Sequence, residues 1–67
     1  MHTMDLHDVV ELMQMEYAEM PELKLTLRQA QRLWNVSTAV CERALETLIG
    51  MGFLARTADG SYIRRSA

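Results

Sequence analysis

The side chains best suited to chemistry in this chain are its basic residues, and they are unevenly distributed. Residues 1–23 contain six acidic residues and no Lys or Arg, whereas residues 24–67 contain all seven basic residues and three acidic ones. The net charge is therefore −6 in the first part and +4 in the second, and −2 in the whole chain. Such a domain can bind phosphate with its second part while its acidic part points away, although the overall sign disfavours strong nonspecific binding to nucleic acid.

Catalysis and metal binding have no comparable support. No nucleophile is paired with a base, no two carboxylates are set for a cleft, and there is no Gly-rich phosphate loop. His2 and His7 lie near Asp5 and Asp8, but their spacing fits no compact metal site. Cys41 has no second cysteine, and its helical position among apolar residues favours a buried thiol over a redox sensor. We therefore expect neither an enzyme nor a protein with a cofactor, a metal or a small-molecule substrate.

Length and composition predict a single domain over residues 1–67. A chain of 67 residues has room for one small core, and its 49% hydrophobic and 24% charged residues are typical of a globular protein. No apolar stretch reaches the roughly 18 residues that would span a membrane, and the N-terminus carries acidic residues where a signal peptide would carry basic ones. The expected location is therefore cytoplasmic, without membrane contact.

Apolar residues at helical spacing predict a first helix from Leu6 to about Glu19. Asp5 is a suitable N-cap, and Pro21 pushes the preceding residue out of helical geometry. The apolar stripe consists of Leu6, Val9, Val10, Met13 and Tyr17. Four of the six Met residues fall between positions 4 and 20, and they can form either core or an adaptable interface. Because so small a core cannot cover every apolar side chain, this helix is the expected surface for a homodimer or a protein partner.

A short strand over residues 23–25 and a second helix are predicted next. Thr26 and Gln29 form the T-x-x-Q capping box that opens the helix. Arg28 and Arg32, four residues apart, project together from its outer face. Its inner face consists of Leu27, Ala30, Leu33 and Trp34.

A third helix and a β-hairpin complete the expected fold. Asn35 tolerates the positive φ of a turn, and Ser37 is the N-cap of a helix to about Ile49. One face of this helix consists of Cys41, Ala44, Leu45 and Leu48, and the opposite face of Ala39, Glu42, Arg43 and Glu46. Gly50 and Gly52 end it, and residues 53–57 and 61–65 flank an Asp-Gly turn as paired strands. The expected core includes Leu27, Ala30, Leu33, Val36, Cys41, Leu45, Leu48 and Leu54.

The segments QAQRLWNVS (29–37) and ALETLIGMGFLARTADGSYIRR (44–65) resemble the helix-turn-helix and wing of bacterial winged-helix transcription regulators. The likeness covers residues 25–65 and rests on the capping box, the V-S pair entering the third helix, the A-L-x-x-L stripe, the G-F-L exit and the D-G hairpin tip. It implies an α+β fold, a small winged helix with three helices, a short strand after the first helix and a C-terminal hairpin wing. It also implies double-stranded DNA as ligand, with the third helix in the major groove and the second helix and wing on phosphate.

The resemblance assigns candidate DNA-binding residues. Ser37 matches the residue that begins the third helix. The positions that match base readers are Thr38, Ala39, Glu42 and Arg43. Those matching phosphate contacts are Arg28, Arg32, Arg56, Arg64 and Arg65. These arginines also have a simpler interpretation, since charged residues on a sheet edge discourage aggregation and those on a helix can be a solvated face.

The chain departs from the resembled pattern in three places. Glu42 and Glu46 place carboxylates beside Arg43, where they repel phosphate. Gln31 stands where the pattern has a small residue, and Asn35 replaces a glycine. The A-D-G-S hairpin tip is short and acidic for a minor groove. Two functions therefore stand side by side: a DNA-binding transcription regulator, dimeric on a symmetric site, and a winged-helix module that binds protein and not DNA.

Overall fold

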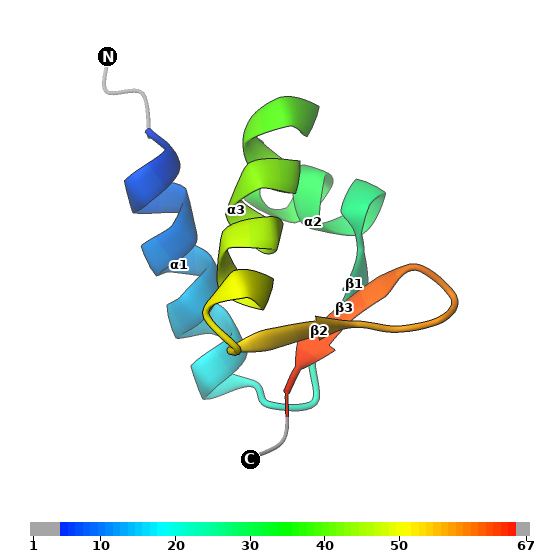
Figure 1. Cartoon of the computed structure of the whole chain (residues 1–67). Helices are drawn as coiled ribbons and strands as arrows, with labels where there is room; N and C mark the ends of the chain where they lie inside the picture. Colours follow the sequence, from blue (N-terminus) through cyan, green and yellow to red (C-terminus); the bar gives the residue numbers. More distant parts are fainter. Residues whose placement is uncertain (1–4, 66–67) are drawn as a thin grey trace.

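Helices and strands follow one another in the order α1, β1, α2, α3, β2, β3 (Figure 1). The structure, a computed structural model, describes residues 5–65, so His2 and Met4 lie outside the described residues. The elements are α1 Leu6–Glu19, β1 Lys24–Thr26, α2 Leu27–Trp34, α3 Thr38–Gly50, β2 Leu54–Arg56 and β3 Ser61–Arg64. Three helices and a three-stranded antiparallel sheet form an α+β fold with the winged-helix layout, as predicted.

The predicted caps begin all three helices. Asp5 Oδ1 and Ser37 Oγ each accept a hydrogen bond from the backbone N–H three residues later, at 2.9 and 3.2 Å. At α2 the capping box is complete, with Thr26 Oγ1 accepting from the Gln29 N–H at 3.2 Å and Gln29 Oε1 accepting from the Thr26 N–H at 2.9 Å. These bonds satisfy N–H groups that have no partner within the helix. The side chains at four sequence positions therefore decide where the helices start.

A single residue in the left-handed conformation forms the turn between α2 and α3. Asn35 has φ 53° and ψ 52°, and its N–H donates to the Gln31 carbonyl. It is the one non-glycine residue of the described chain with a positive φ. Asparagine tolerates this conformation better than most residues, which is why the turn works without a glycine. Only residues 35–37 separate the two helices, so α3 leaves α2 in a new direction (Figure 1).

The last strand in the sequence is the central strand of the sheet, whose order is β1-β3-β2. Tyr62 lies opposite Leu25 on one side and Arg56 on the other. Leu54 and Tyr62, 1% and 6% exposed, turn towards the helices. β2 is one residue shorter than predicted at each end and β3 is one residue shorter at its C-terminal end. β1 lies one residue later than predicted because its register pairs residues 24–26 with residues 61–63.

The buried core of the described chain is formed by one face of α1 and one face of α3, completed by α2 and the sheet. Its side chains are Val9, Met13, Tyr17, Ala30, Cys41, Ala44, Leu45, Leu48, Leu54 and Tyr62. Among the predicted core residues, Leu27 and Val36 are half-buried against this cluster. Leu33 was wrongly assigned to the core, since 54% of it is exposed. On the eight-residue α2, Ala30 and Trp34 face the core, and Leu33 lies 100° around the helix from Trp34, beyond the reach of α1 and α3.

Tyr17 connects three elements from the centre of this core. Its side chain is fully buried on α1, and its hydroxyl donates a hydrogen bond of 2.8 Å to the Tyr62 carbonyl of β3. Its ring lies 6.4 Å from the ring of Trp34 at the end of α2, centroid to centroid. Burial, followed by the nearby Cys41 and Tyr62, raises the pKa of Tyr17 from 10.0 to about 12. The phenol is therefore held neutral, as a donor, over the whole physiological range.

Replacing Tyr17 with Phe should lower the free energy of unfolding by about 1 to 2 kcal/mol, because the ring stays and the buried hydrogen bond is lost. Denaturant unfolding followed by circular dichroism measures this, and Met15→Ala on the exposed face of α1 is the matched control, expected within about 0.5 kcal/mol of the parent. Because the folded pKa is the higher one, stability from Tyr17 is complete below pH 10 and is lost as pH rises towards 12. A Phe variant with unchanged stability and an unchanged alkaline limb would contradict this role.

Candidate nucleic-acid interface

The outer face of α3 is an open surface. Cys41, Ala44, Leu45 and Leu48 are fully buried, so the opposite side of the helix projects outwards. The exposed residues along it include Thr38, Ala39, Glu42, Arg43 and Glu46, as the helical spacing predicted. Arg43 is the one cation on this helix, and it lies between two carboxylates. The face is therefore polar and nearly balanced in charge, and not a basic stripe.

Ser37, the predicted N-cap that was also counted among the DNA-binding residues, and Thr38, a predicted base reader, both have their side-chain oxygens engaged within the protein. Ser37 Oγ accepts the capping bond from Val40 N–H, which makes Ser37 a structural residue. Thr38 Oγ1 donates to Gln31 Oε1 at 3.0 Å. This bond holds the half-buried Gln31 side chain across the turn, beside the beginning of α3.

Gln31 is the residue that sequence reasoning missed. It was treated as an oversized residue beneath the turn, yet its backbone oxygen accepts the N–H groups of Asn35 and Val36 while its amide meets Thr38. With Oε1 accepting from Thr38, the amide nitrogen brings two N–H donors to the start of α3. The only signal in the sequence was the seven-residue spacing to Thr38, which has no meaning until the turn geometry is known.

Arg28 and Arg32 occupy the flank of this surface on α2. Both are exposed and lie opposite Ala30, the fully buried residue of that helix. The side of α2 that carries Gln31 faces the start of α3, so the two arginines lie beside the exposed face of α3. Their predicted common outer face is confirmed by this placement.

The hairpin arginines are arranged by aromatic rings. The Arg56 guanidinium lies 5.8 Å from the centroid of the Tyr62 ring, and that of Arg64 lies 5.2 Å from the centroid of Phe53. Such cation–π contacts orient a guanidinium without using its hydrogen-bond donors. Arg65 is exposed and its N–H donates to the Phe53 carbonyl at 2.9 Å. The structure thus places Arg56 and Arg64 beside aromatic rings, a contact that the sequence did not reveal.

The hairpin arginines do not all lie near the start of α3. Phe53 follows the C-terminal end of α3, and the 13 residues of that helix span about 20 Å. Arg64 and Arg65, which contact Phe53, therefore lie towards the far end of the helix from Thr38. Their placement suits contacts at a separate point on a long ligand.

The tip of the hairpin is tied down. Lys24 Nζ of β1 lies 3.4 Å from Asp59 Oδ2, and Thr57 Oγ1 donates to the Asp59 carboxylate. These contacts, that of Thr57 above all, lower the pKa of the Asp59 carboxyl. These contacts connect the tip of the hairpin to β1, and the Asp59 carboxylate leaves the tip without a basic side chain of its own.

In Figure 1, α1 and α2 lie on opposite sides of α3 and the hairpin tip points away from α1, while the C-terminal part of the acidic helix contacts β3 through Tyr17. The charge separation seen along the sequence is therefore also a separation in space. Within residues 5–65, no group of three or more His, Cys, Asp or Glu side chains is arranged to hold a metal ion, and His7 Nε2 instead lies 3.3 Å from Glu11 Oε2. Over the same residues, no helix has the length and apolarity needed to cross a membrane.

Comparisons of the chain with protein-family models, with curated proteins and with solved structures find no match. The function is therefore inferred from the arrangement of side chains alone.

Cys41 should behave as an inert core thiol. Its side chain is fully buried with Sγ 3.9 Å from the Leu27 carbonyl, and burial, together with the Glu42 carboxylate, raises the pKa of the thiol. At neutral pH a disulfide reagent should therefore label folded protein roughly tenfold or more slowly than protein unfolded in guanidinium. Equal labelling rates in the two states would show that Cys41 is accessible and would reopen the redox interpretation.

Proposed function

We propose that this protein binds double-stranded DNA and regulates transcription, with α3 as the element that enters the major groove. The observation that carries the proposal is the exposed face of α3 flanked by arginines on α2 and on the hairpin, with the acidic helix on the other side. A helix of this kind fits the major groove, and arginines on both flanks can reach the phosphates that border it.

The reading residues have distinct roles in this proposal. Arg43 is the one long donor on the exposed face of α3, and a guanidinium there can make a bidentate contact with guanine. Ala39 offers a methyl group to thymine, and Glu42 can accept from cytosine. Thr38 acts as a positioning residue for the Gln31 amide, which donates to a base edge or a phosphate. Ser37 serves α3 as its cap.

Phosphate contacts come from two places. Arg28 and Arg32 bind the backbone on the α2 flank, and Arg56, Arg64 and Arg65 on the hairpin flank. Because Arg56 and Arg64 already rest on aromatic rings, they lose less side-chain freedom when they bind. The small number of contacts, with −2 on the whole chain, predicts weak binding by one copy, so a symmetric site bound by two copies is part of the proposal.

A second candidate function is a protein-interaction module without DNA binding. Its support is the pair Glu42 and Glu46 on the reading face, together with the exposed apolar side chains of Met15, Leu33 and Met51. A winged helix can present such surfaces to a protein partner as readily as to DNA. Absence of DNA binding even at low salt, where the electrostatic attraction is greatest, would favour this function.

Arg28→Ala and Arg43→Ala should affect DNA binding in different ways. Loss of Arg28 removes one phosphate contact, so binding to all duplexes should weaken alike and the slope of log K against log salt should fall by about one. Loss of Arg43 should cost roughly 1 to 3 kcal/mol on a duplex selected from a random pool and relax the preference at one base pair. Fluorescence titrations at two salt concentrations measure both effects, and identical behaviour of the two variants would contradict the assignment.

Glu42→Gln should tighten binding to random duplex DNA, because it removes a negative charge from the face that approaches phosphate. Glu19→Gln, an exposed carboxylate on α1 away from this face, is the matched control and should change little. If the Glu42 variant instead binds a selected duplex more weakly, the carboxylate reads cytosine and the repulsion argument fails.

A further inference from the structure

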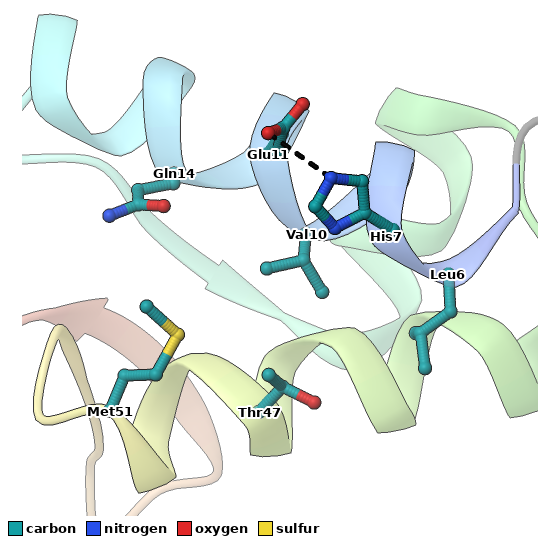
Figure 2. A pocket seen from close by; sticks show the side chains of 7 residues that line it. All are labelled: Leu6, His7, Val10, Glu11, Gln14, Thr47 and Met51. Atoms are coloured by element: carbon teal, nitrogen blue, oxygen red, sulfur yellow. Dashed lines mark ion pairs between the residues drawn. The ribbon is translucent and has the colours of Figure 1, made fainter.

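A shallow apolar groove runs between α1 and the C-terminal half of α3 (Figure 2). It has a volume of about 430 Å³, and its lining consists of Leu6, His7, Val10, Glu11 and Gln14 of α1, Thr47 of α3 and Met51, the residue that follows α3. Leu6 and Val10 are half-buried and Met51 is 58% exposed, so the groove is apolar and accessible. Its volume exceeds that of one leucine side chain, and no described residue of the same chain fills it.

The rim of the groove carries negative charge. Glu11 lies on the α1 side, where its side chain is 62% exposed and its carboxylate is near His7 (Figure 2). From its N-cap to its C-cap, α1 contains five acidic residues and neither Lys nor Arg. Face-to-face packing of two α1 helices would therefore bring carboxylates together, which is unfavourable. The occupant should combine an apolar side chain with a neighbouring cation.

The chain itself carries such a surface on α2, here called the Leu33 patch. It consists of Leu25, Gln29, Arg32 and Leu33, which line a shallow depression beside β1. Leu33 is 54% exposed although it belongs to a helix whose other apolar residues pack inwards, and Arg32 is adjacent to it. Gln29 and Leu33 lie on the side of α2 away from Gln31 and the start of α3, and Arg32 lies between that side and the flank of α3. An exposed leucine beside an arginine complements an apolar groove with a carboxylate at its rim.

We propose that the groove between α1 and α3 binds the Leu33 patch of a second copy of this chain. Leu33 packs over Val10 and Met51, and Arg32 approaches Glu11. The two surfaces are different and lie on different parts of the domain, so the contact is head-to-tail and continues from copy to copy as a chain or a closed ring. Each contact is small, so we expect assembly only at high protein concentration. The inference does not depend on DNA binding.

Sedimentation velocity without DNA, from about 10 µM to 1 mM protein, tests the proposal. The parent should show an average mass that rises with concentration, and added salt should weaken this rise. Leu33→Ser should abolish it, while Met15→Ser, an equally exposed apolar residue of α1 that lines neither surface, should leave it unchanged. Glu11→Arg and Arg32→Glu should each weaken association several-fold, and the double variant should restore it.

Restoration by the exchanged charges is the decisive result, because a general change of net charge would not produce it. A parent that is monomeric at every concentration overturns the proposal. So does association that Leu33→Ser preserves and Met15→Ser removes, since that would place the contact on the outer face of α1. Circular dichroism spectra that match the parent confirm that each variant is folded, and Leu33→Ala serves as the milder substitute if the serine variant is not.

Discussion

The hydrogen bond from the Tyr17 hydroxyl to the Tyr62 carbonyl is the directional constraint that joins the acidic helix to the sheet. It fixes the acidic helix to the central strand of the sheet, and through the ring of Trp34 it also sets the end of α2. Without it, α1 would be held to the sheet by non-directional apolar contacts alone, which specify a position less sharply. One face of α3 packs into the same core and contacts both α1 and β2.

The local features of the fold could be predicted because each depends on a few neighbouring residues. The caps at Asp5, Thr26 and Ser37 and the left-handed Asn35 are properties of the turn in which they occur, and all were confirmed. The prediction that Leu33 is buried was wrong because burial depends on distant elements. Helical spacing gives the direction of a side chain around α2 but not how far the neighbouring elements extend. A face that looks apolar in the sequence can continue past the edge of the core.

The candidate site was predictable in outline and not in detail. Exposed arginines on α2 and a polar outer face on α3 followed from periodicity. The Gln31–Thr38 bond and the aromatic supports of Arg56 and Arg64 join residues that only the tertiary structure brings together. The same holds for the groove between α1 and α3 and for the Leu33 patch, because each combines residues from two separate elements. The distribution of charged residues along the sequence already predicted the charge separation, and the fold places the acidic helix and the exposed arginines of α2 on different sides of α3.

The position of β3 at the centre of the sheet has a consequence for the order of events during synthesis. The strand that emerges last pairs with both earlier strands and accepts the bond from Tyr17, 45 residues before it. Nearly all of residues 5–65 must therefore be made before the sheet and the core can close, and until then the apolar faces of α1 and α3 stay exposed. The domain should accordingly complete its folding only after its last strand is made, and a chain shortened before Ser61 would lose both strand pairings, Tyr62 from the core and the acceptor of the Tyr17 hydrogen bond.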